Sequence, residues 1–211
     1  MSQINLFGES EEQNSRFKIC KGLNVIENGN LLFLPNFFER DISDIFFYEL
    51  RNQTFWKQES MSMYGKMIPF PRLTAWYGDF DKPYSFSGLR LTPHPWTQTL
   101  LDIKNLIEAK ADAKFNSVLL NLYRNGNDSI SWHTDAEREL GLNPTIASVN
   151  FGETRTFQLR HIETKKRIDI ELSHGSLLIM FGELQHHWQH QVPKNSKLVN
   201  ERINLTFRVL K

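Results

Sequence analysis

Two residues of types that commonly bind metal ions lie close together in the stretch "SWHTDAERE", where His133 and Asp135 are separated by a single residue. If the stretch is a β-strand, alternate side chains share a face, so these two stand about 7 Å apart on the same side. A second histidine would complete the 2-His-1-carboxylate set that binds Fe(II) and leaves positions open for a bidentate cosubstrate and dioxygen. Taken alone, the His-x-Asp pattern is more often ordinary exposed surface.

The identity of a third ligand stays open at this point. The remaining histidines are His94, His161, His174, His186, His187 and His190. In "HHWQHQVP", His186 and His190 share a face if the run is extended, but they lie about 13 Å apart, so only one can reach a given ion. A histidine-rich strand can also be structural and bind no metal.

A second polar set comes from the strand-like stretches "LLNLYRNGNDS" and "RINLTFRVL". It consists of Asn121, Tyr123, Arg202, Asn204, Thr206 and Arg208. Guanidinium groups bind carboxylates in a fork, and amides and hydroxyls complete the hydrogen bonding, so the set suits a dicarboxylate ligand. If the polar face is instead solvated, as in many half-buried strands, Arg202 and Arg208 project into water. If it binds a ligand, both arginines are buried beside the metal ligands.

The elements that would position these residues are mostly strands. From Phe115 onward the sequence contains eight short runs that are apolar or have an apolar residue at every second position. Turn residues separate most of them. Eight strands without intervening helices predict a mainly β fold with flanking helices, of the jelly-roll kind. Two amphipathic helices are expected before them, one within residues 39–53 and one after Pro95. Their apolar positions are Ile42, Ile45, Phe46 and Leu50 in the first, and Trp96, Leu100, Ile103 and Ile107 in the second.

Composition places the chain among globular proteins, since 40% of its 211 residues are hydrophobic and its net charge is +1. Residues 1–16 are polar and expected to be flexible, and residues 17–211 are expected to form one domain. The single cysteine, Cys20, excludes an intramolecular disulfide, and no signal peptide or membrane-length apolar run is present. We expect a soluble, intracellular monomer in the cytoplasm, or in the nucleus of a eukaryote. With so little net charge, nucleic-acid binding would depend on local basic patches.

The motifs Asn121-x-Tyr123, His133-x-Asp135, His190 and Arg202-x-Asn204-x-x-x-Arg208 together resemble the AlkB family of Fe(II)- and 2-oxoglutarate-dependent nucleic-acid dealkylases, in both order and spacing. The resemblance runs from "SMSMYGKMIPFPRLTAWYGD" to the end of the chain. It looks closest to the members that repair alkylated bases in double-stranded DNA. It implies a double-stranded β-helix, with iron bound by His133, Asp135 and His190, and with 2-oxoglutarate and dioxygen as cosubstrates. It also implies that Arg208 holds the distal carboxylate of 2-oxoglutarate, while Asn121, Tyr123, Arg202, Asn204 and Thr206 line the rest of that pocket.

The same resemblance implies nucleotide-recognition hairpins at about residues 58–90. Phe86 and His133 would stack a flipped-out base, with Tyr84 nearby and Glu137 at the exocyclic nitrogen. Lesions such as 1-methyladenine and 3-methylcytosine are cationic, which favours aromatic faces and a carboxylate. Phosphate contacts would come from Arg160 and the basic stretch "RHIETKKR" around it.

A hairpin with Met63, Tyr64 and Gly65 at its tip would wedge Tyr64 into the duplex. Two positions depart from the family pattern: Tyr64 replaces an expected phenylalanine, and Ala136 replaces an expected acid. The expected partner is therefore double-stranded DNA. RNA or single strands are an alternative within the family, and a non-catalytic jelly-roll module that binds nucleic acid is an alternative from another class.

Overall fold

The structure is a computed structural model that describes residues 19–63, 65–80, 84–86, 89–198 and 200–211. Residues 1–16, which we expected to be flexible, lie outside the described residues. Within the described part, no helix is long and apolar enough to cross a membrane.

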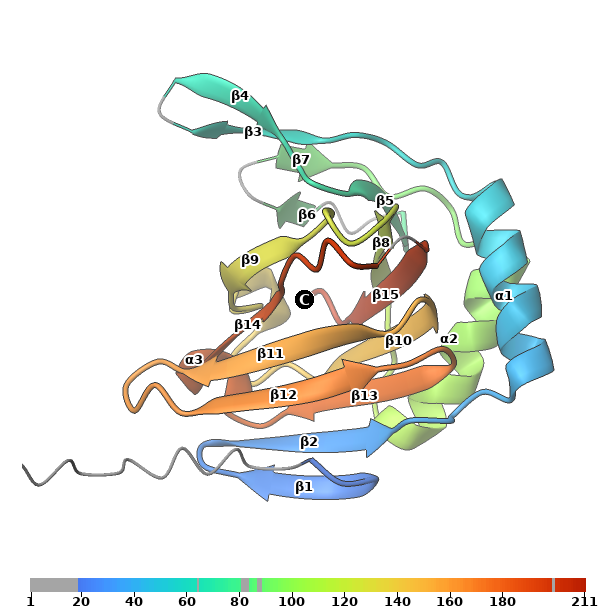
Figure 1. The fold of residues 1–211 in the computed structure, drawn as a ribbon. Helices are drawn as coiled ribbons and strands as arrows, with labels where there is room; N and C mark the ends of the chain where they lie inside the picture. Colours follow the sequence, from blue (N-terminus) through green and yellow to red (C-terminus); the bar gives the residue numbers. More distant parts are fainter. Residues whose placement is uncertain (1–18, 64, 81–83, 87–88, 199) are drawn as a thin grey trace, which may run out of the picture.

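Two antiparallel sheets form the body of the protein and enclose a space between them (Figure 1). The larger sheet contains, in spatial order, β1 (Gly22–Ile26), β2 (Gly29–Leu34), β13 (Ser176–Phe181), β10 (Ile146–Gly152), β15 (Arg202–Arg208), β8 (Ser117–Tyr123) and β5 (Leu73–Gly78). The smaller sheet contains β12 (Arg167–Leu172), β11 (Arg155–His161), β14 (Trp188–Val192) and β9 (Ile130–His133). The mainly β architecture predicted from the sequence is confirmed as a double-stranded β-helix, and each of the eight predicted runs contains one strand.

Two helices, α1 (Arg40–Gln53) and α2 (Gln98–Ala111), cover the outer face of the larger sheet (Figure 1). The hydroxyl of Thr97 caps α2 by accepting a hydrogen bond from the Leu100 N–H at 3.3 Å. A buried core lies between the helices and the sheet. It includes Leu100, Ile103 and Ile107 of α2, Val118, Leu120 and Leu122 of β8, and Ile203, Leu205 and Phe207 of β15. The apolar side of β15 therefore packs toward the helices, which leaves its polar side facing the space between the sheets.

The buried face of α1 differs from the expected one. Ile42 and Ile45 are 42% and 52% exposed, whereas Phe46 and Leu50 pack on the core as predicted. Ser43 of α1 faces the larger sheet instead. It packs so closely on Gly175 that a Cβ atom, if Gly175 had one, would lie only 2.5 Å from Ser43 Oγ. Such a close approach leaves no room for isoleucine. Apolar spacing alone permitted either face, and this backbone contact decides between them.

Shorter elements complete the fold. Two hairpins, β3 (Ser60–Met63) with β4 (Lys66–Pro69) and β6 (Tyr84–Phe86) with β7 (Leu89–Leu91), project beyond one end of the two sheets (Figure 1). They fall in the region where nucleotide-recognition hairpins were expected. Gly65 at the first turn has a φ of +75°, which glycine adopts without strain. A 3-10 turn spans Arg138–Leu140, and the short helix α3 spans Leu184–His187.

Candidate metal and cosubstrate site

Three side chains of the 2-His-1-carboxylate type meet between the sheets. Antiparallel pairing of β9 with β14 places His133 directly opposite His190, and Asp135 follows β9. The ligand atoms of the three side chains all lie within 4.8 Å of one another. Asp135 was expected on the strand, but β9 ends at His133, and the Asp135 N–H instead donates a 2.9 Å hydrogen bond to Gln185 Oε1 of α3. This turn of the chain brings the carboxylate inward, where it is 1% exposed.

Several of the other candidate histidines have contacts elsewhere. His161 Nε2 lies 3.2 Å from Asn28 Oδ1, and His174 Nε2 lies 3.2 Å from Asp44 Oδ1 on α1. His186 contacts the carbonyl of Leu142 and the side chain of Asn143. Among the described residues, the one group of three or more potential ligands is therefore His133, Asp135 and His190.

The protonation states of these residues suit a divalent metal. Burial alone would raise the pKa of Asp135, but the charge and hydrogen bond of Arg208, together with His190 and His133, lower the pKa to about 2. Burial and the adjacent His133 lower the pKa of His190 to about 3, so its imidazole is neutral. His133 Nδ1 lies 2.8 Å from the Ser131 carbonyl, which can only accept, so Nδ1 carries a proton and Nε2 is the ring atom that could bind a metal. An ionised carboxylate and a neutral imidazole are the forms that bind metal.

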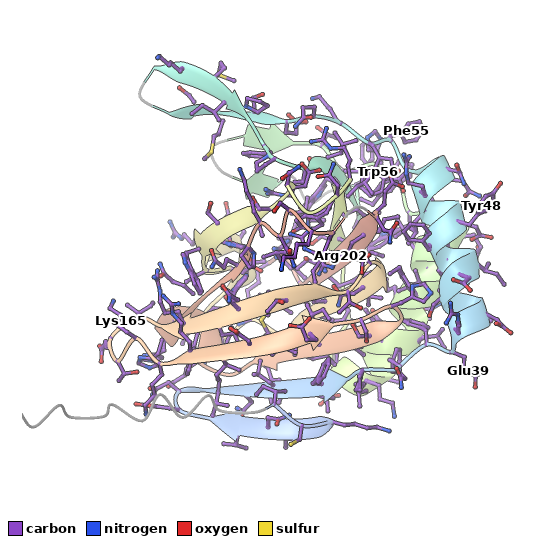
Figure 2. All side chains as sticks on the ribbon, viewed as in Figure 1. Glu39, Tyr48, Phe55, Trp56, Lys165 and Arg202 are labelled. Atoms are coloured by element: carbon purple, nitrogen blue, oxygen red, sulfur yellow. The ribbon has the colours of Figure 1, made fainter. Side chains whose placement is uncertain are left out.

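A cavity adjoins this triad and contains the second polar set. It is lined by Asn121, Tyr123, Arg202, Asn204, Thr206 and Arg208 together with His133, Asp135 and His190. Strand pairing explains the grouping, because β15 and β8 align Arg202 with Tyr123 and Asn204 with Asn121. Arg202 and Arg208 are 1% and 3% exposed, and Figure 2 shows Arg202 in the interior between the sheets. The burial predicted for both arginines is confirmed, and the solvated-strand alternative is wrong.

The two arginines differ in their contacts. Arg208 Nη2 donates to Asp135 Oδ1 at 2.9 Å, so Arg208 lies at the metal end of the cavity. Arg202 stands six residues away on the same strand, about 20 Å along it. Arg202 Nη2 donates to Asn150 Oδ1 at 2.6 Å, while its Nε and Nη1 have no hydrogen-bond partner among the described residues. The ion pair with Asp135 favours Arg202 for the distal carboxylate. The resemblance assigns that carboxylate to Arg208, and the assignment stays a prediction.

Sequence reasoning missed one buried arginine beside this cavity. Arg72 is 3% exposed, and its Nε donates to Asn121 Oδ1 at 2.7 Å. This bond orients the amide so that Asn121 Nδ2 faces Asn204 Oδ1 at 3.5 Å. A lone arginine before a strand carries no sequence signal of burial, because arginine is mostly exposed in proteins.

A second cavity, of about 300 Å³, meets the first at Ile130 and His133, which line both. Its wall also includes Phe70, Trp132 and Glu137. Oε2 of Glu137 is buried and has no hydrogen-bond partner in the described part of the chain. The opening thus combines aromatic surface with a carboxylate oxygen that can accept a hydrogen bond.

The remaining predicted substrate residues are placed only in part. Arg160 stacks over Trp132 at 4.3 Å and donates to Gln189 Oε1 at 2.8 Å, which puts it beside the second cavity. Tyr64 and the side chains of Met63, Tyr84 and Phe86 lie outside the described residues, so their roles stay predictions.

The basic stretch "RHIETKKR" does form one hairpin, between β11 and β12, with Lys165 near its tip (Figure 2). It is less available for phosphate than expected, however. His161 is 1% exposed, and Lys166 Nζ pairs with Glu27 Oε2 at 2.7 Å. Lys165 and Arg167 remain exposed.

The fold and this donor set define a class of protein. A family profile described as "2OG-Fe(II) oxygenase superfamily" matches residues 30–208, and the chain belongs to this family. Fe(II), 2-oxoglutarate and dioxygen are the family's metal and cosubstrates, and the triad with the unpaired donors of Arg202 fits them. Among solved structures, OsALKBH1 superposes with a TM-score of 0.61 at 19% identity, covering 89% of this chain and 99% of that one. At this identity the likeness shows the fold alone.

Sequence relatives narrow the class. The alpha-ketoglutarate-dependent dioxygenase alkB homolog 3 of Bos taurus is 42% identical over 186 residues, which are 83% of this chain and 64% of the relative. The DNA oxidative demethylase ALKBH2 of Homo sapiens is 40% identical over 156 residues, which are 70% of this chain and 60% of the relative. The chain thus spans less than two thirds of the length of either relative. The resemblance to the AlkB family that the motifs predicted is confirmed.

Proposed function

We propose that this protein oxidatively demethylates N-alkylated bases, 1-methyladenine and 3-methylcytosine above all, in double-stranded DNA. The observation that carries the proposal is the junction of the two cavities at His133, one with donors for a dicarboxylate and the other with aromatic surface and Glu137. The name of the ALKBH2 relative, a DNA oxidative demethylase, supports the same reaction.

Each part of the site has a separate task. His133, Asp135 and His190 would hold the metal, and Arg202 would hold the distal carboxylate of 2-oxoglutarate. When bound, Fe(II) with dioxygen supplies the oxidation that converts 2-oxoglutarate to succinate and carbon dioxide and hydroxylates the N-alkyl group. The hydroxylated group then leaves as an aldehyde and restores the base. Arg208 keeps Asp135 ionised and oriented, as its 2.9 Å ion pair indicates.

The second cavity suits a cationic base. Methylation at N1 of adenine or N3 of cytosine gives the ring a positive charge, which an aromatic face and a carboxylate stabilise over a neutral base. The methyl group lies on the Watson–Crick edge, so the base has to leave the duplex before it can reach His133. Phe86 and His133 would stack the flipped base, and Glu137 would accept a hydrogen bond from its exocyclic nitrogen.

Restoration of the base tests the proposal directly. The protein with Fe(II) and 2-oxoglutarate is expected to convert 1-methyladenine and 3-methylcytosine in oligonucleotides to adenine and cytosine, measured by mass. Glu137→Gln should lower the rate on these cationic lesions about tenfold, as loss of a carboxylate charge beside a cationic base predicts, with less effect on neutral 1,N6-ethenoadenine. Failure of the wild-type protein on all three lesions would exclude the proposed substrate class.

Strand preference depends on the β3–β4 hairpin. Tyr64 would fill the gap left by the flipped base, so Tyr64→Ala should slow repair in duplex oligonucleotides several-fold and leave the same lesion in single strands unaffected. Tyr64→Phe serves as the matched control, since the ring is retained. Equal rates for Tyr64→Ala and wild type on duplexes would favour the alternative, a dealkylase of RNA or single-stranded DNA.

A further inference from the structure

The aromatic ring of Tyr123 lies beneath two buried guanidinium groups. The Cζ of Arg202 lies 4.9 Å from the ring centroid, and the Cζ of Arg155 lies 5.4 Å from it. Arg202 and Tyr123 line the cosubstrate cavity, whereas Arg155 does not. Arg155 is 3% exposed, so it is a buried cation behind the wall of the cavity.

Arg155 joins two loops that close this end of the protein. Its Nη2 donates to the carbonyls of Pro193 at 2.7 Å and Asp128 at 2.9 Å, and its Nη1 donates to the Asn125 carbonyl at 3.3 Å. One loop follows β8, which carries Asn121 and Tyr123. The other follows β14, which carries His190. Arg155 thus fixes the end of β8 relative to the end of β14.

The same two loops are bonded to each other through their backbones. The Gly126 N–H donates to the Leu198 carbonyl at 2.9 Å, and the Asn195 N–H donates to the Gly126 carbonyl at 2.7 Å. A Cβ on Gly126 would lie 1.7 Å from the Asn195 carbonyl oxygen, so the loops approach as closely as glycine allows. The wall behind Tyr123 is therefore closely packed, and Arg155 is hydrogen-bonded within it.

Two guanidinium groups lie at this end of the cavity. The hydrogen-bond acceptors of Arg155 and Arg202 are carbonyl and amide oxygens, and in the described part of the chain neither arginine has a carboxylate within 4.0 Å. Asp128 and Glu153 act on Arg155 only from a greater distance. Burial lowers the pKa of Arg202 to about 10, and the charge of Arg155 contributes to that shift, so both remain cationic at neutral pH. Two buried cations beside one ring stabilise an anion placed between the sheets at this end.

We propose that Arg155 is a positioning residue that makes the site selective for a dicarboxylate over a monocarboxylate 2-oxo acid. It holds Tyr123 in place and adds a second positive charge behind the end of the cavity where Arg202 would bind the distal carboxylate. A monocarboxylate lacks the group that this charge acts on. The inference rests on the proposed use of 2-oxoglutarate at this site.

Binding measurements on the full chain loaded with Mn(II), without turnover, test the inference. Isothermal titration with 2-oxoglutarate and with 2-oxobutanoate gives a selectivity ratio for each variant. Arg155→Gln should weaken binding of 2-oxoglutarate about tenfold and binding of 2-oxobutanoate less than twofold. The selectivity for the dicarboxylate therefore falls. Arg155→Lys, which keeps the charge, should retain most of the ratio. Arg40→Gln, the same change at an exposed site on α1, should leave both affinities unchanged.

The other possible outcomes of these binding measurements also decide the question. Equal weakening of both ligands in Arg155→Gln would show a purely structural role, and unchanged affinities would show no role, so either overturns the inference. If Arg155→Gln does not fold, as judged by circular dichroism, Arg155→Met removes the charge while keeping the apolar stem, and the same ratio decides. If wild-type protein does not bind 2-oxoglutarate, the proposed function itself fails, which is a distinguishable outcome.

Discussion

Asp135→Asn is expected to abolish metal binding and base repair, and also to destabilise the metal-free protein. The carboxylate is one of the three proposed ligands, so its loss should remove the metal site. It is also the ion-pair partner of Arg208, at 2.9 Å with both side chains almost fully buried. Removing one partner of a buried pair leaves an uncompensated charge and costs about 3–5 kcal/mol of the free energy of unfolding. Mn(II) titration and urea unfolding of the metal-free variant measure the two effects separately.

A double variant separates the two consequences of this change. Adding Arg208→Met to Asp135→Asn removes the guanidinium that has lost its carboxylate partner. Part of the lost free energy of unfolding should therefore return, while metal binding stays absent. Glu139→Gln, a loss of negative charge at an exposed position nearby, should change neither quantity. Wild-type stability in metal-free Asp135→Asn would mean that the Arg208–Asp135 pair contributes nothing net to folding.

Arg202→Gln is expected to raise the dissociation constant for 2-oxoglutarate about a hundredfold, because two charge-assisted hydrogen bonds to the distal carboxylate are lost at about 1.5–3 kcal/mol each before compensation. Affinity for Mn(II) should stay near that of wild type, since Arg202 contacts none of the three ligands in the structure. Titration of the metal and then of 2-oxoglutarate gives both constants from one protein sample.

Arg208→Gln provides the contrasting variant. Because Arg208 contacts Asp135, its loss should weaken metal binding first and 2-oxoglutarate only as a consequence. The opposite pattern would be weaker binding of 2-oxoglutarate alone in Arg208→Gln and no effect of Arg202→Gln. That result would support the assignment of the distal carboxylate to Arg208 that the resemblance implies.

Local periodicity was enough to predict the strands. The runs of β11 and β12 alternate because one face of each strand is buried and the other is exposed or half-buried, whereas β13 is apolar after Ser176 and buried on both faces. The third metal ligand was different, since His190 meets His133 only through the pairing of β9 with β14, which no spacing within either strand encodes. The motif resemblance supplied the choice that local pattern could not.

Contacts between distant segments account for the other differences. The face of α1 was decided by the approach of Ser43 to Gly175, and the ion pair of Arg208 depends on the position of Asp135 beyond its strand. Arg72 and Arg155 escaped notice because an isolated arginine in sequence looks the same whether it is solvated or buried. In each case the deciding partner lies far away along the chain.

The position of β15 links synthesis of the protein to assembly of its pocket. This strand follows every other described strand in the sequence, yet it lies between β10 and β8 inside the larger sheet. Until it is inserted, β8 and β10 each present an unpaired edge, and Arg202, Asn204 and Arg208 are missing from the cavity. A chain in which β15 is unpaired therefore lacks the arginine that we propose for the distal carboxylate. A register error of one residue would exchange the polar and apolar faces of β15, so the proposed pocket requires both the pairing and the correct register of this strand.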